Sequence, residues 1–152
     1  MFKMKKTIVL FLALVSLKAC KEASKTAETE TFEIGQVWSY QNRVGEDDST
    51  LQILEIDEFK EEGKVYHIAI NDLKLKNPAN PDGLSKRIGH IPISKLALKG
   101  SIVGLLESNK VLPSFKTEYS NWKTAFLSQK GGVFETSVKE TVVFIEQSLN
   151  NR

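Results

Sequence analysis

Residues 50–71 read TLQILEIDEFKEEGKVYHIAIN, and this stretch decides the fold. Two runs rich in Ile, Leu, Val and Tyr, residues 50–57 and 64–71, stand on either side of the polar segment EFKEEG at 58–63. β-Branched and aromatic residues favour strands, and a short polar connection ending in glycine favours a reversal of the chain. The stretch therefore predicts two antiparallel strands joined by a turn.

The first of these two strands carries a break in its apolar alternation. Leu51 and Ile53 are two residues apart, and so are Leu54 and Ile56, but the second pair is out of phase with the first. Because side chains alternate between the two faces of a sheet, this shift predicts a β-bulge or a strand that is buried on both faces.

Another strand precedes this hairpin. Residues 36–44 read QVWSYQNRV and place Trp38, Tyr40 and Val44 at alternating positions. The polar residues GEDDS at 45–49 predict a solvated turn. The three strands together therefore predict an antiparallel meander with short connections.

A loop rich in turn-forming residues follows the meander. Residues 77–83 read NPANPDG, which predicts irregular backbone, and residues 87–91 are a candidate short strand. An ordered loop that contains proline can present a fixed shape to a partner. Asn80, Pro81 and Asp82 are therefore candidate binding residues, with a plain connector as the alternative.

The second half of the chain carries helical patterns. Ser94 is a predicted N-cap for a helix that runs through about Glu107. Gly100 and Gly104 weaken this helix by about 1 kcal/mol each relative to alanine. Its apolar face consists of Leu98, Ile102, Leu105 and Leu106.

Two more helices complete the pattern. The second opens at Pro113 and ends at Gly131, and its aromatic stripe consists of Phe115, Tyr119, Trp122 and Phe126. Residues 133–135 are a candidate short strand. Ser137 and Glu140 have the spacing of a capping box at the start of the third helix. The apolar face of that helix consists of Val138, Val142, Ile145 and Leu149.

This order of elements, strands first and helices last, predicts an α+β fold. We expect an antiparallel sheet of three to five strands, with about three C-terminal helices packed on one face. We also expect the aromatic side chains of the first strand to meet the aromatic stripe of the second helix in the core. A length of 152 residues suits a single domain, which we place at residues 34–150.

The N-terminus has the pattern of a secretory signal. Residues 1–19 contain four lysines and no acid, and residues 7–17 (TIVLFLALVSL) form an apolar run. A membrane-spanning helix needs about 20 apolar residues, so this run instead has the length of a signal-peptide core. It ends at Leu17-Lys18-Ala19-Cys20, which resembles the lipobox of bacterial membrane lipoproteins.

The resemblance implies that Cys20 is lipidated and becomes the first residue of the mature protein. Several acyl chains hold a protein stably on a membrane, so the partner implied for the N-terminus is the lipid bilayer. Lys21 stands where an aspartate would imply retention in the inner membrane. The resemblance thus implies an outer-membrane lipoprotein facing the periplasm, with cell-surface exposure as the alternative. Residues 20–33 then form the lipidated cysteine and a flexible tether.

Charge and composition exclude several classes of protein. The chain has 21 Lys+Arg and 19 Asp+Glu, and removing the four lysines of residues 1–19 leaves 17 against 19. The mature chain is therefore slightly acidic, which argues against nucleic-acid binding. A single cysteine excludes an internal disulfide framework and cysteine-rich zinc modules. No phosphate-binding or metal-binding motif occurs, so we expect neither a cofactor nor a metal.

Candidate functional side chains are few. His67 lies in the middle of a predicted strand and is expected to be partly buried or to contact a neighbouring strand there. His90 lies at the junction between a strand and a helix, where functional residues are common. Tyr119 and Trp122 are candidate binding residues, because aromatic side chains dominate the energetics of interfaces.

These features favour a non-catalytic, envelope-anchored binding domain that recognises a protein, as inhibitors, immunity proteins and assembly factors do. The alternative is an envelope hydrolase that uses His90 or a pair of acids. A small-molecule carrier, with a sheet curled around an apolar cavity, is the third hypothesis.

Overall fold

The computed structural model describes residues 31–151, and the chain from Thr31 onward forms one folded unit. The predicted signal peptide, the lipobox with Cys20 and residues 21–30 of the predicted tether lie outside the described residues. The folded unit begins before the predicted boundary at residue 34. Phe32 is buried, and its ring packs edge-on against Trp38 and Tyr66.

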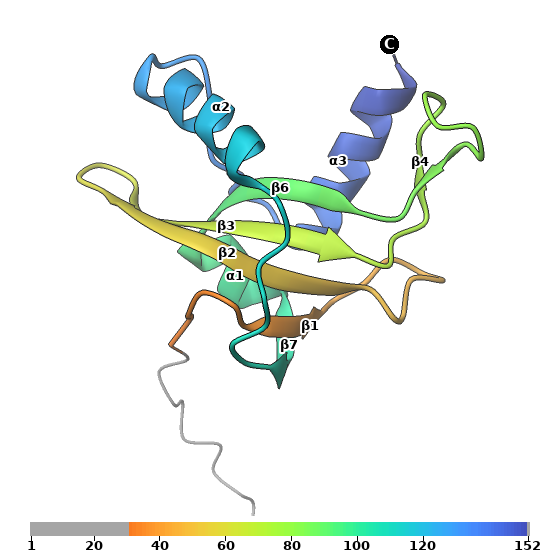
Figure 1. The fold of residues 1–152 in the computed structure, drawn as a ribbon, viewed down its shortest axis with the longest axis horizontal. Coiled ribbons are helices and arrows are strands. Elements are labelled where there is room, and N and C mark those ends of the chain that lie inside the picture. The colour runs from red at the N-terminus through yellow and green to blue at the C-terminus, as the bar shows by residue number, and fades with distance from the viewer. Residues whose placement is uncertain (1–30, 152) are drawn as a thin grey trace, which may run out of the picture. The chain divides into compact units, whose positions relative to one another are not determined.

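The fold is α+β, as predicted (Figure 1). Five antiparallel strands form the main sheet in the order β6-β3-β2-β1-β7. Their bounds are β1 Val37–Tyr40, β2 Thr50–Phe59, β3 Gly63–Asn71, β6 Ile88–Ser94 and β7 Ile102–Glu107. A separate two-stranded ribbon consists of β4 (Leu75–Lys76) and β5 (Leu84–Ser85). The helices are α1 Lys95–Ser101, α2 Lys116–Leu127 and α3 Val138–Asn150. In residues 31–151, no helix is long and apolar enough to cross a membrane.

The β2–β3 hairpin contains the predicted bulge. The register between these strands shifts between Ile53 and Glu55. After the shift, Ile56 pairs with Tyr66 on the core face, while Glu55 pairs with His67 on the opposite face. The bulge therefore turns Glu55 and Asp57 of β2 toward the same side of the sheet as His67.

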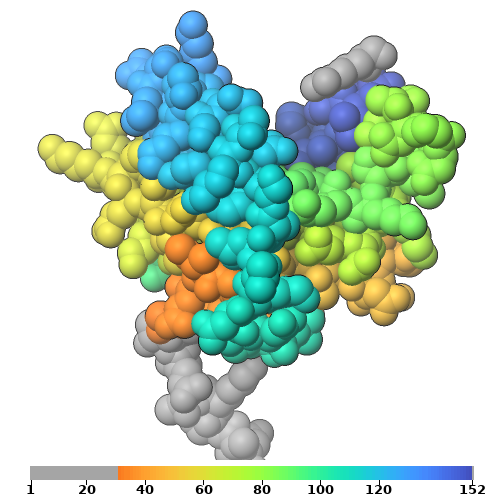
Figure 2. All heavy atoms as spheres, viewed as in Figure 1, coloured from red at the N-terminus to blue at the C-terminus, as the bar shows by residue number. Residues whose placement is uncertain are grey.

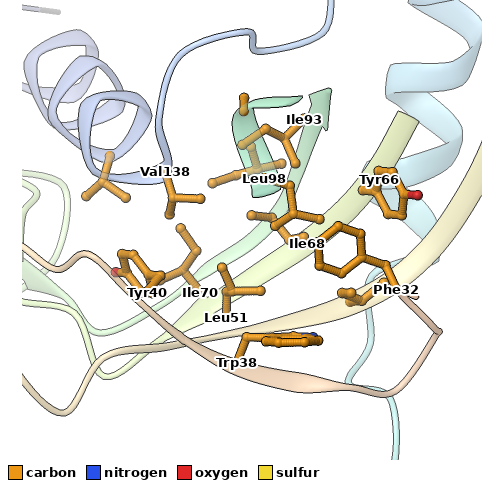
Figure 3. Packing of buried hydrophobic residues seen from close by; sticks show 14 of the residues in the cluster. Phe32, Trp38, Tyr40, Leu51, Tyr66, Ile68, Ile70, Ile93, Leu98 and Val138 are labelled. Carbon is orange, nitrogen blue, oxygen red and sulfur yellow. The ribbon is translucent and has the colours of Figure 1, made fainter. Parts of the chain in front are cut away.

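The main core lies between one face of the sheet and helices α1 and α3 (Figure 3). Side chains from five strands and both helices meet there. They include Trp38, Tyr40, Leu51, Ile68, Ile70, Ile93, Leu98 and Val138. Because β3 alternates, Ile68 and Ile70 enter this core, while His67 and Ala69 face the other way.

Helix α2 covers the opposite face of the sheet. A second apolar cluster there consists of Leu54, Ala69 and Phe115, with Leu112 and Tyr119 packed against it. The expectation that helices pack on one face thus holds for α1 and α3 but not for α2. The expected meeting of the aromatic side chains of β1 with the α2 stripe was wrong for the same reason: the sheet lies between them. β3 is apolar on both faces, so both faces need a cover.

The helix predicted from Ser94 ends much earlier than expected. Ser94 caps α1 as predicted, since its Oγ accepts from the backbone N–H of Ala97 at 3.3 Å. The chain leaves the helix at Ile102, however, and residues 102–107 form β7 rather than further helical turns. Two glycines and two β-branched residues weaken the helix here, and pairing with β1 supplies the backbone hydrogen bonds instead.

The two edges of the main sheet differ. At the β6 edge, the predicted short strand at 133–135 is reduced to a single parallel bridge between Ile93 and Phe134. The N–H of Phe134 donates to Pro92 O, and the N–H of Ser94 donates to Phe134 O, both at 2.9 Å. The β7 edge has no neighbouring strand within residues 31–151.

Candidate functional site

His67 is the centre of a polar cluster beneath α2. It lies in the middle of β3, opposite Glu55 of β2 and Pro92 of β6. Its side chain is 0% exposed, which is deeper burial than the strand position predicted. A titratable ring that is fully removed from water must be paired or neutral, so its neighbours decide its state.

His90 of β6 is the first of these neighbours. Its Nε2 lies 2.9 Å from Nδ1 of His67, and the two rings are nearly parallel, with 9° between their planes. In this hydrogen bond one nitrogen donates and the other accepts. If both rings carried two protons, two N–H groups would face each other at this distance. The contact therefore exists only while the pair carries at most one positive charge.

Asp57 of β2 lies on the other side of His67. Its Oδ2 is 3.3 Å from Nε2 of His67, but the alignment is too poor for a hydrogen bond. Nε2 of His67 is thus a buried polar atom with no hydrogen-bond partner among residues 31–151. Electrostatics favours a proton on this Nε2, facing the carboxylate. Nδ1 of His67 then accepts the hydrogen bond that Nε2 of His90 donates.

Polar side chains of α2 converge on the same carboxylate. The Tyr119 hydroxyl donates to Asp57 at 2.9 Å, and Nζ of Lys123 donates both to Asp57 at 2.9 Å and to the Tyr119 oxygen at 2.7 Å. One turn earlier, Nζ of Lys116 donates to Glu55 at 2.8 Å. Helix α2 is thus attached to β2 by charge-assisted hydrogen bonds.

Aromatic rings of α2 close the cluster from above. The Trp122 ring centre is 4.6 Å from that of His67, and the Tyr119 ring centre is 5.0 Å from it. The indole Nε1 of Trp122 donates to Gly132 O at 2.8 Å, which orients the ring. The ring of Phe126 stacks on Trp122 at 4.9 Å. These contacts are edge-on or stacked, the favourable geometries for rings.

Burial keeps both histidines neutral at pH 7. Burial and, to a smaller extent, the neighbouring His90 lower the pKa of His67 to about 4, against the attraction of Asp57. Burial also lowers the pKa of His90, partly offset by the charge of Glu118. Burial raises the pKa of Asp57, but the hydrogen bonds from Lys123 and Tyr119 outweigh it, so that its pKa lies below the usual value. The carboxylate is therefore charged while the imidazoles are not.

The structure brings together three of the residues singled out in the sequence, His90, Tyr119 and Trp122. The roles of Asp57 and Lys123 were missed. No local pattern indicated them, because Asp57 reaches the cluster through the pairing of β2 with β3 and Lys123 through the docking of α2. The period of the aromatic stripe was the one available signal, since Lys123 follows Trp122 and lies one turn after Tyr119.

The remaining predicted residues lie elsewhere. Asn80, Pro81 and Asp82 belong to the loop between β4 and β5, where Nδ2 of Asn80 donates to Leu84 O at 2.6 Å. Oδ1 of Asp82 accepts from the N–H of Leu84 at 3.1 Å. This loop is ordered by its own hydrogen bonds and is not part of the histidine cluster.

In the described part of the chain, neither the surface hollows nor a group of metal ligands involves the histidine pair. Three surface hollows of about 500, 320 and 350 Å³ are lined by other residues, and neither histidine lines any of them. Within residues 31–151, no group of three or more His, Cys, Asp or Glu side chains could hold a metal ion.

Comparison of the chain with protein-family models, with curated proteins and with solved structures finds no match in any of the three. The arrangement of its own residues is therefore the basis for a functional proposal.

Proposed function

We propose that this protein is an envelope-anchored lipoprotein with a non-catalytic domain that binds another protein along strand β7. The observation that carries this proposal is an open sheet edge whose first five residues are uncharged. Residues 102–106 of β7 read IVGLL, and β7 has no strand beside it within residues 31–151. Natural edge strands usually carry charges, prolines or bulges that prevent pairing with another chain. These five residues contain neither a charge nor a proline, although the pairing of β7 with β1 shifts register at two points.

The side chains of this edge are unusually accessible for aliphatic residues. Val103 is 67% exposed, Leu105 47% and Leu106 58%. Ile34 and Val111 are also exposed. They are adjacent in sequence to Gly35 and Lys110, which are joined near the end of β7 by a hydrogen bond from the Lys110 N–H to Gly35 O. Contiguous exposed aliphatic side chains favour burial against a partner. The strand lies along the lower edge of the molecule in Figures 1 and 2.

The geometry of the edge favours one kind of partner. Gly104 and Leu105 pair with β1 in regular register, and an extended segment can add to such an edge. We therefore expect the partner to contribute a β-strand with aliphatic side chains. The hydrolase alternative has less support. It requires substrate to reach His90, whereas the histidines bond to each other beneath the aromatic rings of α2.

Photo-crosslinking in native envelopes tests this proposal. A photo-reactive amino acid at Val103 should capture a discrete protein, because the side chain lies on the proposed interface. Val44 is the matched control, since it is an aliphatic side chain on a turn and is 100% exposed. Adding Val103→Lys and Leu106→Lys to a chain that carries the probe at Leu105 should abolish capture, with the free energy of unfolding unchanged within about 0.5 kcal/mol. Equal capture from positions 44 and 103, or none from either, would contradict the proposal.

The anchor is tested in the same preparation. Wild-type protein should incorporate labelled fatty acid and sediment with membranes, whereas Cys20→Ala should do neither. If wild-type protein incorporates no label, the lipoprotein assignment is wrong. The proposed binding along β7 would then still be tested by the crosslinks.

A further inference from the structure

Helix α2 depends on the histidine cluster for its place on the sheet. None of its residues is buried, in contrast to α1 and α3, which insert Leu98 and Val138 into the main core. Hydrogen bonds to Asp57 and Glu55 join α2 to the sheet, and so do the contacts of Tyr119 and Trp122 with the imidazole of His67. The rings of Trp122 and Phe126 also contact Phe59 of β2. Helices held by few buried apolar contacts open locally at low free-energy cost.

A proton added to this cluster disturbs the contacts that hold α2. A second charge on the pair would break the hydrogen bond between His67 and His90, because two N–H groups would then meet across 2.9 Å. A single charge on His67 would attract Asp57, whose Oδ2 is 3.3 Å from Nε2. The same Oδ2 accepts from the Tyr119 hydroxyl, so a charge on His67 competes with Tyr119 for the carboxylate that attaches α2.

The other charges around the pair stabilise one added proton at most. From β2, Glu55 already pairs with Lys116, and from α2 the cation of Lys123 opposes a charge on His67. Glu118 of α2 has no hydrogen-bond or ion-pair partner within residues 31–151, and its charge favours a proton on His90. The residue of β6 that pairs with His67 is the uncharged Pro92. A single charge on His90 is therefore tolerated, and the second charge on the pair is the one that breaks the hydrogen bond.

We propose that the His67–His90 pair is an acid-sensitive latch: the neutral pair holds α2 against the sheet, and protonation of the pair releases the helix. This goes beyond the proposed binding at β7, which lies at the far edge of the sheet and does not require α2 to move. Release exposes the second apolar face, which includes Leu54, Ala69 and Phe115.

The size of the effect follows from linkage. In the closed state the pKa of His67 is about 4, against 6.5 for a solvated imidazole, so only the open state takes up a proton readily between these values. If opening restores the solvated value, the ratio of open to closed molecules rises about 20-fold between pH 7 and pH 5. The latch is thus closed at neutral pH and weakens as the pH falls.

Hydrogen exchange of the full chain in detergent tests the latch. Protection factors, corrected for the intrinsic pH dependence of exchange, should fall about 20-fold for the amides of α2 between pH 7 and pH 5. At both pH values they should lie below those of β2, β3 and α3, because α2 opens without unfolding of the sheet. In the double variant His67→Gln, His90→Gln, which cannot take up the proton, the protection of α2 should be the same at both pH values. If the double variant does not fold, the single variant His90→Gln, which changes the buried site less, serves as the test. It should reduce the pH dependence of α2 protection.

Three results would overturn the latch. The first is an equal protection of α2 at pH 7 and pH 5 in the wild-type chain. The second is a protection of α2 that equals that of the strands at both pH values, which would indicate that α2 opens only by global unfolding. The third is a pH dependence of α2 that survives removal of the titrating imidazoles. None of these outcomes bears on the crosslinks from β7.

Discussion

At the scale of single residues, the most constrained charge outside the histidine cluster is Glu46. Glu46 is only 4% exposed, and its carboxylate oxygens accept from the Arg43 guanidinium and from the N–H of Lys74. The same guanidinium reaches Glu146 of α3 at 3.1 Å. The hydrogen bonds of Arg43 hold the pKa of Glu46 below its usual value, against the effect of burial. Arg43 therefore joins the turn after β1 to the last helix.

Removing the Arg43 guanidinium should leave the buried Glu46 carboxylate without a cationic partner. Arg43→Gln is expected to lower the free energy of unfolding by about 3 kcal/mol, because the Glu46 carboxylate loses its partner while it remains buried. Urea denaturation measures the change. The matched control is Lys110→Gln, which breaks the exposed pair with Glu107 and should cost less than about 1 kcal/mol. Equal losses in the two variants would show that Glu46 is not held as described.

Sequence reading was incomplete at this scale. Residues 45–49 predicted a solvated turn, and the turn is present, but Glu46 is buried within it. A carboxylate enters the interior only when a cation accompanies it, and the cation here is three residues upstream with its second partner on α3. The sequence spacing allowed the first contact, and only the tertiary fold supplied the second.

At the scale of elements, the start of α3 was predicted correctly in detail. The Ser137 Oγ accepts from the N–H of Glu140, and the Glu140 side chain accepts from the N–H of Ser137. A tertiary contact strengthens this helix start, since the N–H of Val138 donates to Oγ of Ser101 at the end of α1 at 2.9 Å. A local motif and a contact between helices thus satisfy the first N–H groups of α3 together.

Loss of the cap should have a modest and specific cost. Ser137→Ala is expected to lower the free energy of unfolding by about 1 kcal/mol, because the N–H of Glu140 loses its acceptor. Ser148→Ala in the same helix is the control, since its hydroxyl bonds only to Phe144 O in the preceding turn, and alanine favours the helix. Thermal or urea unfolding separates the two, and a larger effect from position 148 would contradict the capping assignment.

Helix α1 and strand β7 show where element prediction failed. The apolar residues from Leu98 to Leu106 fit a helical face, but the chain changes to a strand after Ser101. Helical spacing and strand pairing compete for these residues. The competition is decided by β1, which pairs with Ile102, Gly104 and Leu105 and lies more than 60 positions earlier in the chain. A local pattern cannot report such a distant partner.

At the scale of the whole molecule, stability should depend on pH through His67. Its pKa in the folded state, about 4, is below the solvated value of 6.5, so the folded state binds fewer protons than the unfolded state between these values. Stability is therefore complete above pH 6.5 and is lost as the pH falls toward 4, by about 3 kcal/mol. The lowered pKa values of Asp57 and Glu46 add a further loss at still lower pH.

Urea titrations at a series of pH values measure this dependence. The free energy of unfolding should fall between pH 6.5 and pH 4 in the wild-type chain and stay nearly constant in His67→Gln. A wild-type curve that is flat or rises as the pH falls through this window would show that the imidazole is not buried in its neutral form.

The sequence by itself determined the α+β class, the β2–β3 hairpin with its bulge and the capped start of α3. Each of these depends on interactions within a few residues of the chain or on the alternation of one strand. Only the tertiary structure decided that α2 covers the second face of the sheet, that His67 meets His90 and Asp57, and that β7 forms an open edge. These features join residues from different elements, and their energies come from burial and charge pairing that exist only after the elements pack together.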